Sequence, residues 1–310
     1  GREIAAARGF LQGFNGYPVR LVVLPEYWMT GFPLGETREE CMAKATIRLG
    51  GPQEAAIAAI ASRFKLFVCS NHYETDEHFP GLYFQANVIY GPDGATVLRY
   101  RRMISLYTPT PYDVWDQYLE IYGPDAIFPV ADTEIGVLGT IASEEILYPE
   151  VARMLTLKGA EVLLHPTSEV GSPALTSKHI SKKARAVENM AYVVSANSAG
   201  IFGTPVTANA TDGMYIVLDP YGRTLAEAGT GDTFNANAVL DIGELRESRQ
   251  KTGMTNLLSR LPMAAFAPAY AQADHAPANF MADGRMRERA EVLEKQALTI
   301  KRLIESGVLK

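Results

Sequence analysis

The sequence predicts an α/β fold, because segments with strand character alternate with segments of helical periodicity along the chain. The strand-like segments are short and apolar, as in residues 20–26 and 160–165. Continuous apolar runs of this kind suit a sheet that is covered on one face by helices and on the other by a second sheet. The helical segments between them include the alanine-rich residues 51–63 and residues 179–190.

The N-terminal elements follow from apolar spacing and turn residues. Apolar side chains at Ile4, Ala7, Phe10 and Leu11 predict a first helix. Because the chain starts inside this helical pattern, we expect that an earlier strand is missing from the sequence. Strands are predicted over residues 20–26, 66–70, 87–90 and 95–99, with a turn over 91–94.

The alternation continues to about residue 260, so we predict one domain over residues 1–260. Residues 107–123 are rich in proline, aromatic and acidic residues without a clean period, and we expect a functional loop there. The later elements are a helix that Pro149 opens and Gly159 ends, the helix over 179–190, and strands over 135–142, 160–165, 191–197, 214–218 and 238–241.

Residues 261–310 form a predicted C-terminal extension. Residues 261–283 are rich in alanine, proline and methionine with little period, which indicates an extended tail. Residues 285–306 are predicted to be a charged helix with an apolar stripe, ending at Gly307. We expect this stripe to pack on the domain or on a partner subunit.

Composition excludes several classes of function. A net charge of -6 offers no electrostatic footprint for nucleic acid or for an anionic membrane surface. No apolar run is long enough to span a bilayer, and no signal peptide is visible. Cys41 and Cys69 have neither metal-ligand spacing nor a disulfide framework, so we expect a reduced, cytoplasmic setting.

One polar residue stands at a strand-turn-helix junction. The apolar run 135–142 stops at Ser143, and Pro149 then opens a helix that ends at Gly159. A turn of this kind holds one side chain clear of the backbone, beside the amide groups of a helix start, where an oxyanion hole is feasible. An ordinary polar turn residue is the alternative.

Two further charged residues are candidates for a site. Glu26 ends an apolar strand, where a carboxylate is costly unless it is paired or chemically used. The alternative is a glutamate that reaches solvent. Arg101 and Arg102 are adjacent on a strand and therefore face opposite ways, so that one can point to solvent while Arg102 points into a cleft. Two solvated surface arginines are the alternative.

Five motifs in the same order resemble those of the nitrilase superfamily of carbon–nitrogen hydrolases. The segment Leu24-Pro-Glu26 before Thr30-Gly31 resembles the first, and the turn ending at Gly94 with residues 99–102 resembles the second. The third is residues 136–150, and residues 185–189 and 196–200 fit the downstream pattern. The resemblance implies a four-layer αββα sandwich, a homodimer or larger homo-oligomer, and no metal or organic cofactor.

The family uses a Glu-Lys-Cys triad, and this chain departs from it at two positions. Ser143 stands at the position of the cysteine nucleophile, and Arg102 stands at the position of the lysine. A serine hydroxyl is far less acidic than a thiol and normally needs a histidine relay, which the sequence does not show. We therefore hypothesise an engineered Cys→Ser replacement at 143, with a natural serine as the alternative. Arg102 is expected to be a natural variant that stabilises an oxyanion or binds a substrate carboxylate.

The resemblance implies an amidase-type hydrolase acting on a small-molecule amide or nitrile. Residue 143, as cysteine, attacks the carbonyl carbon, Glu26 takes its proton, and Arg102 with a backbone amide near Glu144 holds the oxyanion. A true nitrilase is less favoured, because a tryptophan usually follows the nucleophile in those enzymes, whereas Glu144 follows residue 143 here. A natural pseudoenzyme is the alternative from another class.

The family also adds a second acid before the third motif, and either Asp116 or Glu120 can supply it. The sequence leaves this choice open. Expected pocket walls, with core packing as the alternative for the aromatic ones, are Tyr27, Trp28, Tyr148, His165 and Glu169.

Overall fold

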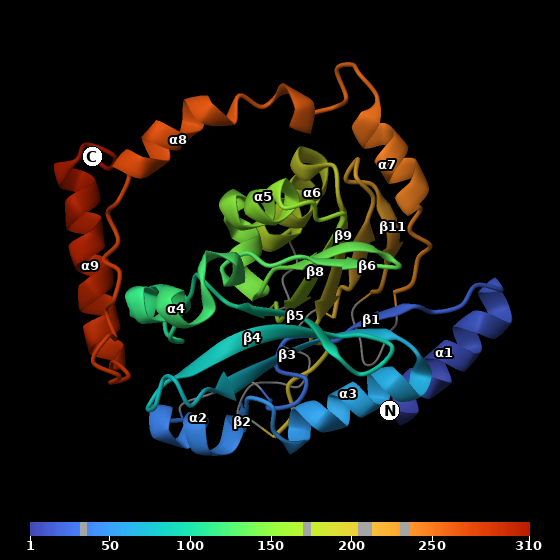
Figure 1. Ribbon diagram of the computed structural model, residues 1–310, viewed down its shortest axis with the longest axis horizontal. Helices are drawn as coiled ribbons and strands as arrows, with labels where there is room; N and C mark the ends of the chain where they lie inside the picture. Colours follow the sequence, from blue (N-terminus) through green and yellow to red (C-terminus); the bar gives the residue numbers. More distant parts are fainter. Residues whose placement is uncertain (32–35, 170–174, 204–212, 230–235) are drawn as a thin grey trace.

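Two mixed β-sheets lie face to face in the computed structural model (Figure 1), which describes residues 1–31, 36–169, 175–203, 213–229 and 236–310. The first sheet has the order β1-β3-β4-β5, with β2 also paired to β3. Its strands are β1 (Leu21–Val23), β2 (Thr46–Arg48), β3 (Phe67–Thr75), β4 (Tyr83–Tyr90) and β5 (Thr96–Arg101). The second sheet has the order β11-β10-β9-β8-β7-β6. Its strands are β6 (Ala131–Thr133), β7 (Gly136–Thr140), β8 (Val162–Thr167), β9 (Tyr192–Asn197), β10 (Ile216–Leu218) and β11 (Thr224–Glu227).

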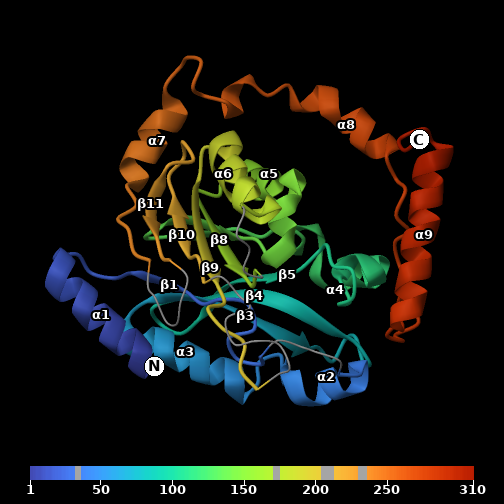
Figure 2. The same cartoon turned by 180° about the vertical axis from the view of Figure 1, so that it is seen from behind.

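Helices cover the outer face of each sheet, so the predicted four-layer αββα architecture is confirmed. On the side of the first sheet lie α1 (Arg2–Asn15), α2 (Arg38–Ala45) and α3 (Pro52–Phe64) (Figures 1 and 2). On the side of the second sheet lie α5 (Pro149–Leu157) and α6 (Ser177–Asn189). The largest core joins Cys69 and Ile89 of the first sheet to Leu138 and Leu163 of the second. Apolar side chains at period two thus face each other between the sheets.

The remaining helices are peripheral. Residues 111–122 form a short 3₁₀ turn, η1 (Pro111–Val114), and then α4 (Trp115–Tyr122). The C-terminal part runs along the outside of the layers through α7 (Ile242–Gln250), α8 (Met263–Gln272) and α9 (Arg289–Glu305), and α9 lies beside α4 in both views (Figures 1 and 2). No helix among the described residues has the length and apolar character needed to cross a membrane.

Three sequence predictions of irregular or extended structure are wrong. The expected loop over 107–123 contains α4, because its aromatic residues recur at helical spacing and bury Tyr118 against Phe79. The expected extended tail contains α8, since an alanine-rich segment favours helix even with Pro268 inside it. The expected strand over 238–241 is absent from the described chain, where Asp241 instead caps α7 by accepting a hydrogen bond from the Glu244 amide.

Candidate active site

Ser143 begins a 3₁₀ helix, η3 (Ser143–Leu147), shortly after β7 ends. Its side chain is buried, and its backbone has a φ of 49°, in the left-handed region that residues other than glycine rarely adopt. The predicted helix after the turn is confirmed as α5, which starts at Pro149 and ends before Gly159. Ser143 itself lies at the 3₁₀ turn rather than at the start of α5, because the two carboxylates after it occupy a separate short helix.

His165 of β8 forms hydrogen bonds that hold the backbone turn at Ser143. Its Nε2 lies 2.7 Å from the Ser143 carbonyl oxygen, and its Nδ1 lies 2.9 Å from Ser195 Oγ. Because a carbonyl oxygen can only accept, Nε2 carries the proton and Nδ1 accepts from the serine hydroxyl. Burial lowers the pKa of His165 to about 3, so the imidazole is neutral. The sequence predicts a pocket wall here, but the structure places His165 fully inside the protein.

Glu145 ties the turn to the segment that carries Arg102. One carboxylate oxygen accepts hydrogen bonds from the Met103 and Ile104 amides at 2.7 and 3.0 Å and from the Tyr100 hydroxyl at 2.8 Å. The other oxygen accepts from the Ala142 amide at 3.1 Å. These bonds fix two distant chain segments to each other. This role was not predicted, although the acidic residue two positions after the nucleophile in the third motif was a signal for it.

Parallel strands explain why Glu26 and Arg102 come together. β1 runs parallel to β3, and β5 does so too, because β3–β4 and β4–β5 are both antiparallel. Residues that follow β1 and β5 therefore lie at the same end of the sheet. Arg102 Nη1 lies 3.9 Å from the Glu26 carboxylate, and Gln85 bridges them, accepting from Arg102 at 2.8 Å and donating to Glu26 at 2.7 Å. Both charged side chains are buried rather than solvated.

The guanidinium of Arg102 is held by several partners. It donates to the Ile104 carbonyl at 2.7 Å and pairs with Glu144 at 2.6 Å. Burial would lower the pKa of Arg102, but the carboxylates of Glu26, Glu144 and Glu145 raise it, so the side chain stays cationic. Its positive charge therefore lies beside the turn that carries the nucleophile position.

Glu26 has hydrogen-bond partners from the second sheet as well. Its carboxylate accepts from Ser168 Oγ at 2.5 Å, and its backbone carbonyl accepts from Ser198 Oγ at 2.8 Å. The Glu26 amide donates to the Thr167 carbonyl at the end of β8. The strand end that carries the acid is thus fixed to the strand ends of the opposite sheet.

Lys178 is a residue of this site that the sequence analysis missed. It lies in the first turn of α6, and its Nζ is 3.4 Å from Ser143 Oγ and 3.3 Å from Thr167 Oγ1. Burial is the largest cause that lowers the pKa of its ammonium group. No spacing signal pointed to it, because it lies outside the motifs and its approach to Ser143 depends on the packing of α6 over the second sheet.

The two residues predicted as candidates for a second acid lie on the surface. Asp116 and Glu120 are exposed on α4, and within the described chain neither carboxylate contacts Glu26, Arg102 or Ser143. They are therefore not placed as the second acid.

The predicted pocket walls have varied environments. Trp28 and Tyr148 are partly exposed, and the indole of Trp28 donates to Ser70 Oγ at 3.1 Å. Tyr27 is half-buried and receives a hydrogen bond from the Tyr73 hydroxyl. Glu169 is buried against Lys182 at 2.5 Å, so its carboxylate already has a cationic partner.

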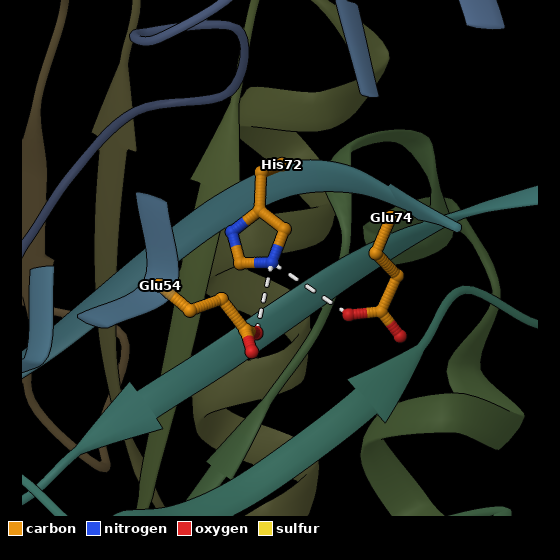
Figure 3. Close-up of side chains that lie close together, drawn as sticks. All are labelled: Glu54, His72 and Glu74. Carbon is orange, nitrogen blue, oxygen red and sulfur yellow. Dashed lines mark ion pairs between the residues drawn. The ribbon is translucent and has the colours of Figure 1, made fainter. Parts of the chain in front are cut away.

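A second buried cluster of charged side chains lies away from Ser143. Figure 3 shows His72 Nε2 facing the carboxylates of Glu54 and Glu74, at 3.6 and 3.7 Å. Arg99 pairs with both carboxylates. Burial would raise the pKa of Glu54, but hydrogen bonds from His72 and Arg99 lower it to about 2. The network balances three acids with three bases: Glu54, Glu74 and Asp76 with His72, Arg99 and Arg101.

This cluster is better explained as a structural ion-pair network than as a metal centre. A divalent cation between the two glutamates would lie beside the guanidinium of Arg99, and like charges repel in a buried environment. The network also explains why Arg101 does not point to solvent, as the sequence analysis had allowed. Arg101 pairs with Glu74 and Asp76 and lies over the ring of Phe84.

Comparisons with known proteins agree with the fold. Residues 5–250 match the family model described as carbon-nitrogen hydrolase. The omega-amidase NIT2 of Bos taurus is 24% identical over 249 residues, which cover 80% of this chain and 86% of the relative. A carbon-nitrogen hydrolase from Helicobacter pylori G27 has a TM-score of 0.62 at 20% identity, covering 86% of this chain and 92% of that one. A double mutant of the amidase from Nesterenkonia sp. AN1, in complex with acrylamide, has a TM-score of 0.55 at 21% identity, covering 80% and 86%. At these identities the solved structures show a shared fold.

Proposed function

We propose that this chain, which belongs to the carbon–nitrogen hydrolase family, hydrolyses the carbon–nitrogen bond of small carboxamides. The observation that carries the proposal is the convergence of the buried Glu26, Arg102 and Ser143 on strand ends of two facing sheets. The names of the relatives support an amide rather than a nitrile substrate, because they include omega-amidases and an amidase that binds acrylamide. Glu144 directly after residue 143 also favours the amide.

In the proposed reaction, residue 143 attacks the carbonyl carbon and carries the acyl group. The positive charge of Arg102 and a backbone amide near Glu144 stabilise the oxyanion. Glu26 is the proton carrier for the leaving nitrogen and for the water that releases the acid. If cysteine is the native residue at 143, the intermediate is a thioester, and if serine is native, it is an ester. Reading codon 143 in the source gene distinguishes the two.

The test of this function is ammonia release by the purified protein and its Ser143→Cys variant. The panel contains simple primary amides, terminal amides of dicarboxylic acids, N-carbamoyl compounds and nitriles. We expect ammonia from amides with at least one of the two proteins, and none with Ser143→Ala, which keeps the fold but has no nucleophile. If neither protein releases ammonia from any compound of the panel, the result would count against a hydrolase and in favour of a pseudoenzyme.

We also propose a cytoplasmic setting and a homo-oligomeric assembly. The two buried cysteines are free, which supports a reducing cytoplasm. The expected homodimer or larger oligomer is supported by exposed apolar side chains on α9, among them Leu293, Leu298 and Ile304. Sedimentation equilibrium would give a mass of at least twice 33.9 kDa if this is correct.

A further inference from the structure

We propose that Lys178 is the general base that takes the proton of Ser143, so that the serine itself is a competent nucleophile. This inference rests on the proposed amidase function, since it names a catalytic residue of that same site. It also removes the need for a cysteine at position 143. A serine nucleophile paired with a lysine base is a known alternative to the histidine relay.

Geometry is the first support. The Lys178 amine and the Ser143 hydroxyl are 3.4 Å apart, and Thr167 Oγ1 on β8 holds the amine from a second side at 3.3 Å. The helix start that carries Lys178 is fixed by Thr176, whose hydroxyl accepts from the His179 amide at 3.2 Å and caps α6. Lys178 therefore reaches the nucleophile from a helix end that a capping hydrogen bond holds in place.

Among the residues that the structure describes, Lys178 has no carboxylate ion-pair partner that would keep a lysine protonated. The nearby acid Glu169 pairs with Lys182, one helical turn further along α6, at 2.5 Å. Within the described residues, the partners of the Lys178 amine are hydroxyl groups. An amine that faces hydroxyls in a half-buried site loses its proton more easily than one in an ion pair.

Burial of Lys178 favours its neutral form. Withdrawal from water lowers the pKa of Lys178 below the ordinary value of 10.5, and the cations Lys182 and Arg102 lower it further. The carboxylates of Glu26 and Glu169 act in the opposite direction without reversing the shift. His165 beneath the nucleophile is neutral and adds no charge. The base is the neutral amine, so the reaction accelerates as pH rises through this lowered pKa.

The chemical difference between arginine and lysine explains the assignment. Arg102 stands where relatives of this family have lysine, and a guanidinium keeps its proton under all working conditions. An arginine there can stabilise negative charge but cannot accept a proton from serine. Lys178 supplies, from a different element, the amine that position 102 lacks.

The proposed steps balance. Ser143 Oγ bonds to the amide carbon while its proton moves to Lys178 Nζ and the carbonyl electron pair moves to oxygen. The tetrahedral adduct collapses, the carbon–nitrogen bond breaks, and Lys178 passes its proton to the Glu26 carboxylate, which delivers it to the leaving nitrogen. Water then adds to the ester carbon and gives a proton to Glu26, which passes it through Lys178 back to Ser143 Oγ as the acid departs. The sum is amide plus water to acid plus ammonia.

The test uses a fluorophosphonate probe, which forms an Oγ–P bond with an activated serine and releases fluoride. We expect the unsubstituted protein, called the parent below, to be labelled at Ser143. The Lys178→Met variant should be labelled at least about 100-fold more slowly, which is the usual loss for a missing general base. Lys178→Arg keeps the charge but cannot act as a base, so it should lose labelling as well. Lys183→Met, an exposed lysine on the same helix, is the matched control and should be labelled at the parent's rate.

A second comparison separates this inference from the proposed function. In the Ser143→Cys background, a thiol can ionise without the amine, so adding Lys178→Met should leave most of the ammonia release. The labelling rate of the parent should rise with pH toward a midpoint below 10.5, and Lys178→Met should lack that rise.

Several outcomes would overturn the assignment of Lys178. Equal labelling of the parent and Lys178→Met would do so, as would an unlabelled parent whose Ser143→Cys variant releases ammonia. Labelling restored by Lys178→Arg would show that only the positive charge matters. If no variant hydrolyses any amide, the proposed function is wrong, while the labelling rates still decide whether Lys178 activates Ser143.

Discussion

Replacing His165 by leucine tests whether this histidine holds the nucleophile turn. Leucine is similar in size and fills the site, but it pairs with neither the Ser143 carbonyl nor the Ser195 hydroxyl, which His165 contacts at 2.7 and 2.9 Å. Each buried polar group left without a partner costs about 1–3 kcal/mol, so the variant should lose about 2–6 kcal/mol of unfolding free energy. Urea unfolding at pH 7, extrapolated to zero denaturant, measures this loss.

A paired substitution sharpens the same experiment. Adding Ser195→Ala to His165→Leu removes one of the two unpaired groups, so about 1–3 kcal/mol should be recovered. If His165→Leu is as stable as the parent, or if Ser195→Ala costs as much in the double variant as alone, the role assigned to His165 is wrong.

The pH dependence of stability gives an independent check. The pKa of His165 is lowered to about 3 in the folded protein, against 6.5 for the free side chain. A lowered folded pKa means that the unfolded state binds the extra proton, so the stability contributed by neutral His165 is present above pH 6.5 and is lost as pH falls toward 3. The parent should therefore lose about 1.4 kcal/mol per pH unit in this window through this group. His165→Leu lacks that loss, so the two unfolding curves should converge in acid.

Three other predictions follow from the site. Cys41 and Cys69 are both buried, so the folded parent should react slowly with a thiol reagent, whereas Ser143→Cys should gain one rapidly labelled thiol if the position is open to small molecules. Glu26→Gln should lower amide turnover by about 10²–10⁴-fold if the carboxylate carries protons, and unchanged ammonia release would exclude that role. Glu169→Leu should destabilise the protein by about 3–5 kcal/mol, since it leaves Lys182 buried without its partner, and the double variant with Lys182→Met should recover most of this loss in urea unfolding.

The layered fold could be predicted because it depends on local patterns. Proline at its start and glycine after its end predict the helix between Pro149 and Gly159, and an apolar run predicts the strand that precedes it. The positions of Glu26, Arg102 and Ser143 follow from motifs that combine such elements. These features need no knowledge of which strands pair across the sheets.

The parts that failed depend on long-range packing. The burial of Arg101 requires Glu74 and Asp76, which approach it across β4 in a pairing that no local pattern encodes. Lys178 reaches Ser143 only after α6 docks on the second sheet. The same holds for His165, whose position at a strand end does not reveal that its imidazole contacts the backbone carbonyl of Ser143.

Because the backbone of Ser143 is left-handed, thermostability and activity favour different residues at this position. A side chain other than glycine in that conformation costs about 1–2 kcal/mol, so Ser143→Gly should relax the turn and raise the melting temperature while deleting the nucleophile. Selection of variants by heat resistance alone would then tend to retain a glycine that ends catalysis. The strained turn therefore holds the nucleophile at a cost in stability.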